Sequence, residues 1–146
     1  MQRRRVLVTG ATGYIGGRLA PRLLAAGYDV RVLVRSPEKL RDVPWAKQVD
    51  ILRGDLGDPD SLTAATAGMD VVYFLVHSMG TSAEFVETER IGASNLAAAA
   101  KASGVGRIVY LGGLHPEGTE LSPHMRSRAQ VGRILVESGI PTMVLQ

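Results

Sequence analysis

The sequence of 146 residues contains no cysteine. This absence excludes a disulfide framework, thiol catalysis and thiolate metal sites, and we expect no metal centre. Long apolar runs are also missing, since none approaches the roughly 18 consecutive apolar residues of a membrane-spanning helix. A chain without cysteine fits a reducing compartment, so we expect a cytoplasmic protein with no membrane partner.

Aromatic residues and excess charge are scarce as well. Phe, Trp and Tyr make up 5% of the residues, and 17 basic against 14 acidic side chains give a formal net charge of +3. Apart from Arg3 to Arg5, the arginines are scattered, with few aromatic residues among them. A nucleic-acid-binding surface needs clustered basic side chains, so we expect no nucleic-acid partner.

What the chain does contain is a regular alternation of strand-like and helix-like segments, within a length that fits one domain. Strands are predicted at 5–9, 30–34, 49–53, 70–76, 108–111 and 141–146. Helices are predicted at 14–26, 58–68, 81–102 and 122–139, and a short helix is predicted to begin at Ser36. Such alternation predicts a parallel sheet with helices on both faces and right-handed crossovers.

Several helix starts and buried helix faces are predicted from local residue types. Ser36 and Asp58 each precede a proline, as N-caps often do, and Thr81 with Glu84 has the spacing of a capping box. Apolar spacing predicts that two helices turn the following residues inward: Ile15, Leu19, Leu23 and Leu24 in the first, and Val131, Ile134 and Leu135 in the last.

A glycine-rich segment joins the first predicted strand to the first predicted helix. Gly10 allows a tight turn out of the strand, Gly13 allows backbone to approach a phosphate, and Gly16 allows the helix to lie close to the sheet. The free N–H groups and dipole of the helix N-terminus then attract an anion. This arrangement predicts a site for the pyrophosphate of a dinucleotide.

With its other motifs, the chain resembles the short-chain dehydrogenase/reductase superfamily, in its extended and atypical branches, including NAD(P)H-binding proteins similar to the NmrA-like regulators. The segments that carry this resemblance are 9–16, 53–56, 70–76, 95–100 and 104–110. The resemblance implies a Rossmann-type doubly wound α/β sheet of strand order 3-2-1-4-5-6, followed by a substrate-binding portion. The sequence ends within the sixth predicted strand, so we expect residues 1–146 to be a truncated Rossmann domain without that portion.

The resemblance also implies a cofactor site along the carboxyl ends of the strands. Its expected residues are Gly10, Thr12, Gly13, Tyr14, Ile15, Gly16, Arg35, Asp55, Leu56, Leu75, Val76 and His77. Arg35 stands where NAD-binding relatives usually place a carboxylate, and a guanidinium pairs well with a 2′-phosphate, so we expect NADP rather than NAD. The alternative is that Arg35 is only a solvated residue at a strand end.

Two further roles are implied for residues beside this site. Asp55 is expected to accept a hydrogen bond from the adenine amino group while Leu56 contacts the ring; alternatively, Asp55 only caps a turn. Asn95 is expected to tie its helix to a loop. Tyr110, within a predicted strand, is expected to lie in the core.

The chain departs from the resembled reductases at their catalytic residues. Those proteins carry a serine after strand five and a Tyr-x-x-x-Lys on the next helix, whereas this chain has glycines at 112 and 113 and His124 with Arg128 at the tyrosine and lysine spacing. The arginine favours a neutral imidazole, which is a poor proton donor. His124, Arg128 and His77 are therefore weak candidates for catalysis, and each has a structural alternative.

Two functional hypotheses follow from these residues. The first is the NADP-preferring domain of an atypical oxidoreductase acting on an unknown small molecule, with enzymatic activity left open by the missing residues. The second is a non-catalytic NAD(P)-sensing regulator similar to the NmrA-like proteins. A homo-oligomer formed through the helices at 81–102 and 122–139 is compatible with either hypothesis.

Overall fold

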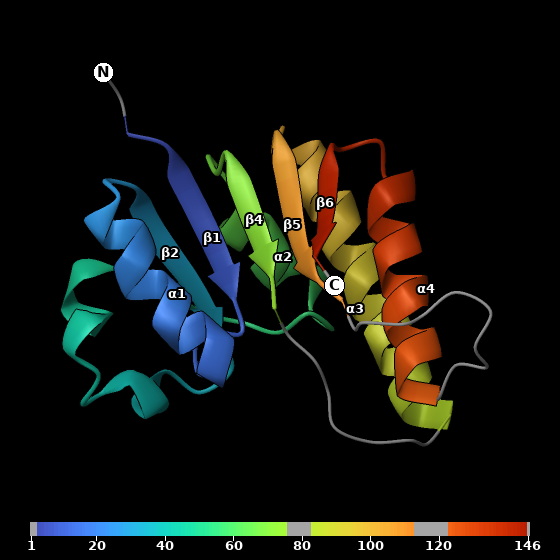
Figure 1. The fold of residues 1–146 in the computed structure, drawn as a ribbon, viewed down its shortest axis with the longest axis horizontal. Helices are drawn as coiled ribbons and strands as arrows, with labels where there is room; N and C mark the ends of the chain where they lie inside the picture. The colour runs from blue at the N-terminus through green and yellow to red at the C-terminus, as the bar shows by residue number, and fades with distance from the viewer. Residues whose placement is uncertain (1–2, 76–82, 113–122, 146) are drawn as a thin grey trace.

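The computed structural model describes residues 3–75, 83–112 and 123–145, with the side chains of 83, 123 and 124 left out. Its centre is a parallel sheet in the order β3-β2-β1-β4-β5-β6, which confirms the predicted topology (Figure 1). The strands are β1 (Arg5–Thr9), β2 (Asp29–Val34), β3 (Asp50–Arg53), β4 (Val71–Phe74), β5 (Arg107–Leu111) and β6 (Thr142–Leu145).

Helices cover the two faces of the sheet. They are α1 (Tyr14–Ala25), α2 (Pro59–Thr66), α3 (Ala83–Ala102) and α4 (Pro123–Glu137), with 3₁₀ turns η1 (Pro37–Leu40) and η2 (Pro44–Gln48). In Figure 1, α1 and the two turns lie over one half of the sheet, whereas α2, α3 and α4 lie behind and beside the other half. The fold is therefore a doubly wound α/β domain, as expected.

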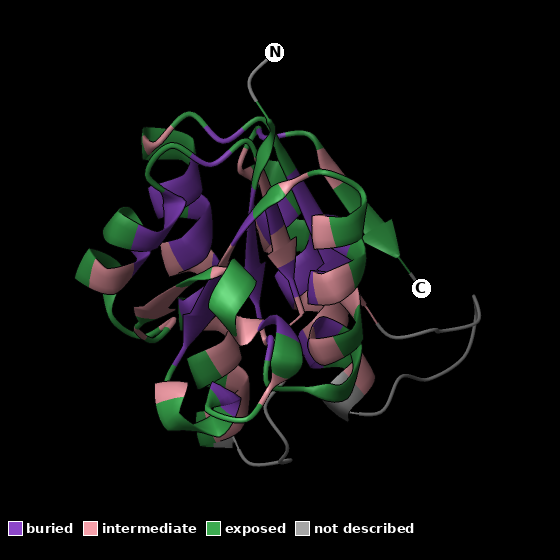
Figure 2. Cartoon of the chain, turned by 90° about the vertical axis from the view of Figure 1, so that its left-hand side faces the viewer, coloured by how far each residue is buried: buried purple, intermediate pink, exposed green. Residues whose placement is uncertain are grey.

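Alternate residues of each central strand enter two separate cores. Val6 and Val8 of β1 pack on the side of α1, whereas Leu7 packs on the side of α2, α3 and α4. All three side chains are at most 1% exposed. Burial on both faces explains why the strands are almost continuously apolar. Figure 2 shows the buried residues concentrated in the sheet and on the inward faces of the helices.

Helix starts agree with the predicted caps in one place and not in another. The Asp58 carboxylate accepts a hydrogen bond from the Asp60 N–H at 3.1 Å and caps α2, as predicted. The short helix predicted to begin after Ser36 is present as the 3₁₀ helix η1, with Pro37 as its first residue, but the predicted cap is wrong because the Ser36 side chain makes no capping hydrogen bond. Pro44 restricts Val43 to an extended conformation, and Val43 is the N-cap residue of η2. Thr81 lies outside the described residues.

The predicted inward face of α1 is wrong at Ile15, which is 47% exposed. The face instead runs through Gly16, Ala20 and Leu23, which are buried at helical spacing. Because Gly16 faces the backbone of Gly10 and Ala11, the residue before it is turned away from this contact. In α4 the prediction holds, with Val131 and Leu135 at most 2% exposed.

Candidate functional site

A cavity of about 630 Å³ lies at the carboxyl edge of the sheet, where strands β1, β2 and β4 end. Its lining residues come from the strand ends, the loops that follow them and the faces of α3 and α4: Thr9, Gly10, Thr12, Gly13, Leu33, Val34, Arg35, Gly54, Asp55, Leu56, Gly57, Phe74, Leu75, Thr88, Glu89 and Val131. The crossovers reverse direction between β1 and β4, so the cavity occupies the switch point where doubly wound sheets bind ligands.

The glycine loop between β1 and α1 forms one wall of this cavity. Gly10 adopts a φ of 84°, a region that favours glycine, and its carbonyl accepts a hydrogen bond from the Gly13 N–H at 3.0 Å. A Cβ atom on Gly16 would lie 2.2 Å from the Gly10 oxygen, a distance that no side chain permits. The glycines therefore form a tight turn on which the first turn of α1 rests.

The N-terminus of α1 borders the same wall. Gly13 is its N-cap residue, in extended conformation, and has no side chain to accept hydrogen bonds from the first N–H groups of the helix. These donors and the positive end of the helix dipole suit a phosphate group. Backbone N–H groups in this wall can therefore bind an anion, because no capping side chain occupies these donors.

Thr9, at the end of β1, fixes this loop relative to the neighbouring strand. Its hydroxyl donates a hydrogen bond to the Tyr73 carbonyl at 3.1 Å and accepts one from the Leu75 N–H at 3.4 Å. The residue is 1% exposed. Thr9 is a polar residue at the end of an apolar strand, directly before the glycines. This sequence feature could have identified Thr9 as part of the site.

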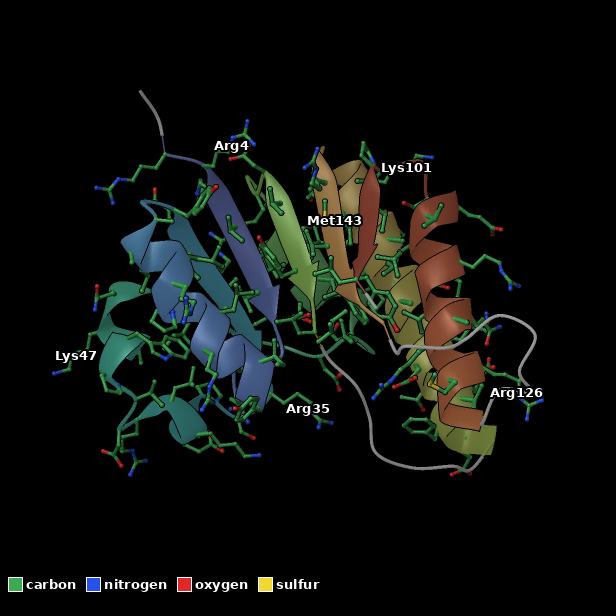
Figure 3. The ribbon with its side chains drawn as sticks, in the orientation of Figure 1. Arg4, Arg35, Lys47, Lys101, Arg126 and Met143 are labelled. Carbon is green, nitrogen blue, oxygen red and sulfur yellow. The ribbon has the colours of Figure 1, made fainter. Side chains whose placement is uncertain are left out.

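Arg35 and Asp55 lie beyond the ends of β2 and β3, at the cavity rim. Figure 3 shows the Arg35 side chain extending from the end of β2 along the carboxyl edge of the sheet. Asp55 Oδ1 accepts a hydrogen bond from the Gly57 N–H at 3.3 Å, so this carboxylate caps a turn. Both side chains are exposed, and both line the cavity.

Leu56 is held in the cavity wall by α3. The Asn95 side-chain amide donates a hydrogen bond to the Leu56 carbonyl at 2.9 Å, which confirms that Asn95 ties its helix to a loop. A Cβ atom on Gly92 would lie 3.0 Å from the Leu56 Cβ atom, so the loop packs directly on this helix. The β3–α2 loop is therefore fixed from two sides, by its own turn and by α3.

The wall formed by α3 and α4 contains Thr88, Glu89 and Val131, none of which was predicted to be in the site. Ser127 of α4 is 3% exposed, and its hydroxyl donates a hydrogen bond to Glu89 Oε2 at 2.7 Å. The two residues are 38 positions apart, and only the packing of α4 on α3 brings them together. Nothing in the local sequence marked this contact.

Tyr110 anchors α4 to the sheet from below this wall. Its hydroxyl donates a hydrogen bond to the Arg128 carbonyl at 3.1 Å, and its ring packs edge-on against Phe74. Burial raises the pKa of Tyr110 well above its usual range, the charge of Glu89 raises it further, and Arg128 lowers it. Tyr110 is 1% exposed, so it is a core residue as expected.

The remaining predicted residues are placed as follows. The described residues that line the cavity do not include Tyr14, Ile15 or Gly16. The Arg18 guanidinium instead stacks over the Tyr14 ring, 3.7 Å from the ring centre. Val76 and His77 lie outside the described residues. His124 belongs to α4, but its side chain is not described; Arg128 is half-buried and is not among the described residues that line the cavity.

Within the described residues, no group of three or more His, Cys, Asp or Glu side chains is placed to hold a metal ion. None of the described helices is both long enough and apolar enough to span a membrane.

Comparison with protein families matches residues 10–138 to the family described as NAD(P)H-binding. Among curated proteins, the chain is 36% identical over 137 residues to (4-alkanoyl-5-oxo-2,5-dihydrofuran-3-yl)methyl phosphate reductase of Streptomyces griseus, covering 93% of this chain and 44% of the relative. It is 33% identical over 138 residues to photosystem II assembly factor Ycf39 of Cyanophora paradoxa, covering 92% of this chain and 42% of the relative.

Solved structures show the same architecture. Citrobacter sp. triphenylmethane reductase complexed with NADP(H) matches with a TM-score of 0.79 and 26% identity, over 96% of this chain and 48% of that chain. The Escherichia coli NADPH-dependent quinone oxidoreductase complexed with NADPH matches with a TM-score of 0.75 and 26% identity, over 95% of this chain and 47% of that chain. The chain therefore spans about half the length of these structures.

Proposed function

Because the chain belongs to the NAD(P)H-binding family, within the atypical short-chain dehydrogenase/reductase superfamily, we propose that it is the NADP(H)-binding module of an oxidoreductase. The observation that carries this proposal is the contact between Gly16 and Gly10, which brings the α1 N-terminus to the cavity without a capping side chain. Backbone N–H groups at this position would bind the pyrophosphate.

The preference for NADP over NAD rests on Arg35. An arginine directly after β2 lines the cavity where a carboxylate would receive the ribose hydroxyls of NAD. A guanidinium donates two parallel hydrogen bonds to a phosphate, and its positive charge attracts the 2′-phosphate of NADP. Asp55 and Leu56 would then contact the adenine, since the turn that fixes them leaves both at the cavity wall.

For catalysis, the bound cofactor would supply hydride transfer, and the chain would supply binding and orientation. His124 and Arg128 share one helix at a spacing of four residues, which suits a pair that holds the nicotinamide ribose or a polar substrate. A small carbonyl compound or quinone is the proposed substrate class. Turnover of NADPH with such a compound by the full protein, lost in His124→Phe, would support catalysis, and turnover retained in that variant would exclude His124.

Calorimetric titration with NADPH and NADH tests the cofactor proposal. We expect wild-type protein to bind NADPH at least about tenfold more tightly, because charged hydrogen bonds to a phosphate contribute roughly 1.5–3 kcal/mol. Arg35→Ala should lose about 10- to 100-fold of NADPH affinity and leave NADH affinity within twofold. Arg22→Ala, which removes an exposed arginine in the last turn of α1, is the matched control. Equal affinity of the wild type for both cofactors would contradict the role of Arg35.

A further inference from the structure

We propose that Glu89, held by Ser127, binds the nicotinamide-ribose half of the dinucleotide and thereby fixes the direction in which the cofactor lies in the cavity. This inference rests on the proposed function, since it concerns the same cavity. It adds a residue that contacts the cofactor and determines the orientation of the cofactor. This residue lies on the cavity wall formed by α3 and α4, opposite Arg35.

Arg35 is the one cationic side chain among the described residues that line the cavity; the Asp55 carboxylate lies on the same side of it, and the Glu89 carboxylate lies on the other side. Arg35 follows β2, on one side of β1, whereas α3 and its residue Glu89 belong to the crossover from β4 to β5, on the other side. The glycine loop lies between the two sides. Phosphate groups are attracted by Arg35 and by the α1 N-terminus and repelled by the Glu89 carboxylate. The nicotinamide half has no phosphate other than the pyrophosphate, whereas the adenosine half of NADP also carries the 2′-phosphate. The nicotinamide half is therefore the half that would face Glu89.

The Glu89 carboxylate is held in place before any ligand arrives. Ser127 is 3% exposed and donates to Glu89 Oε2 at 2.7 Å, and α4 is itself fixed to β5 by the bond from Tyr110 to the Arg128 carbonyl. An immobilised side chain loses less entropy when a ligand binds. The wall therefore presents a preorganised acceptor.

The chemistry of a carboxylate defines what it would bind. Its two oxygens can accept about four hydrogen bonds, so the bond from Ser127 is compatible with further bonds to a ligand. The nicotinamide half offers suitable donors in the two ribose hydroxyls and the carboxamide N–H₂ group. A carboxylate also accepts the ribose hydroxyls of the adenosine half in proteins that bind NAD, so the chemistry has a precedent within the same fold class.

Titration with NADPH and with 2′,5′-ADP distinguishes the contributions that the two halves of the cofactor make to the binding affinity. The reason is that 2′,5′-ADP contains the adenosine and its 2′-phosphate but no nicotinamide ribose. We expect Glu89→Ala to weaken NADPH binding about tenfold and Glu89→Gln, which keeps one acceptor oxygen, to weaken it about threefold. Affinity for 2′,5′-ADP should stay within twofold in both variants. Ser127→Ala should weaken NADPH binding less than Glu89→Ala, since it only loosens the carboxylate.

Glu84→Ala is the matched control, because it removes an exposed carboxylate from the first turn of the same helix. It should change neither affinity. Unchanged NADPH affinity in the Glu89 variants would overturn the inference, as would an equal loss for NADPH and 2′,5′-ADP. If wild-type protein binds neither ligand, the proposed function itself fails. Far-UV circular dichroism confirms folding, and Glu89→Gln preserves the size of the side chain should Glu89→Ala fail to fold.

Discussion

The two walls of the cavity are built in different ways. The glycine wall is made by a continuous segment in which backbone contacts, such as that between Gly10 and Gly16, determine the shape. The opposite wall is made by side chains on two helices, where Glu89 and Ser127 meet across 38 positions of sequence. The first wall depends on the absence of side chains and the second on their presence. Substitutions should therefore affect the two walls differently.

The largest expected effect is at the glycine wall. Gly16→Ala should lower the free energy of unfolding by about 3 kcal/mol, because the new methyl group would lie 2.2 Å from a backbone oxygen that cannot move freely. NADPH affinity should fall with it, since the α1 N-terminus would be displaced. Urea unfolding and calorimetric titration measure the two effects.

Gly17→Ala is the matched control for this prediction. A Cβ atom there would lie 3.5 Å from the Ala11 carbonyl oxygen, an ordinary contact, inside the same helix. Alanine in a helix interior is favoured over glycine by up to about 1 kcal/mol, so this variant should be as stable as wild type or more stable. Similar losses in both variants would show that the contact with Gly10 is not what makes position 16 special.

An intermediate effect is expected where Asn95 of α3 supports the β3–α2 loop. Asn95→Asp keeps the size of the side chain but cannot donate to the Leu56 carbonyl, so we expect a loss of about 1.5 kcal/mol of stability. Affinity for 2′,5′-ADP should fall several-fold because the loop that carries Asp55 is less ordered. A variant with wild-type stability and affinity would show that the turn alone positions this loop.

The smallest expected effect comes from Tyr110, behind the opposite wall. Tyr110→Phe removes the bond to the Arg128 carbonyl and should cost about 1 kcal/mol at pH 8. Because the folded-state pKa of Tyr110 is raised, its contribution is complete below the unfolded-state pKa of about 10 and declines as pH rises above that value.

Urea unfolding at pH 8 and above pH 10 measures this difference. The advantage of wild type over Tyr110→Phe should shrink at the higher pH. A difference that stays constant or grows above pH 10 would contradict the raised pKa of the buried phenol.

Sequence reasoning predicted the fold because the alternation of apolar strands and helices is local and leaves few topologies once crossovers are right-handed. It also predicted that Gly10, Gly13 and Arg35 lie together, and all three line the cavity, since Gly10 and Arg35 directly follow strands and Gly13 is the N-cap residue of α1. It was wrong about Ile15, which is exposed beside the contact of Gly16 with the Gly10 and Ala11 backbone, and about the cap at Ser36, whose side chain makes no capping hydrogen bond.

The opposite wall was not predicted, for a physical reason. Glu89 and Thr88 lie on a segment of α3 that is rich in polar and charged residues, which in the sequence indicates a solvent-exposed surface. Their place in the cavity depends on how α3 and α4 pack against the sheet. Val131 was expected only as a core residue, yet it also borders the cavity. Contacts between distant segments decide these positions, and a single sequence contains no record of such contacts.

A crystal structure of the protein with NADPH bound tests the central claim most directly. The account predicts the pyrophosphate against Gly10, Gly13 and the N-terminus of α1, the 2′-phosphate at Arg35, and the nicotinamide half toward α3 and α4. A cofactor bound outside this cavity, or lying in it with the adenosine half toward Glu89, would contradict the account.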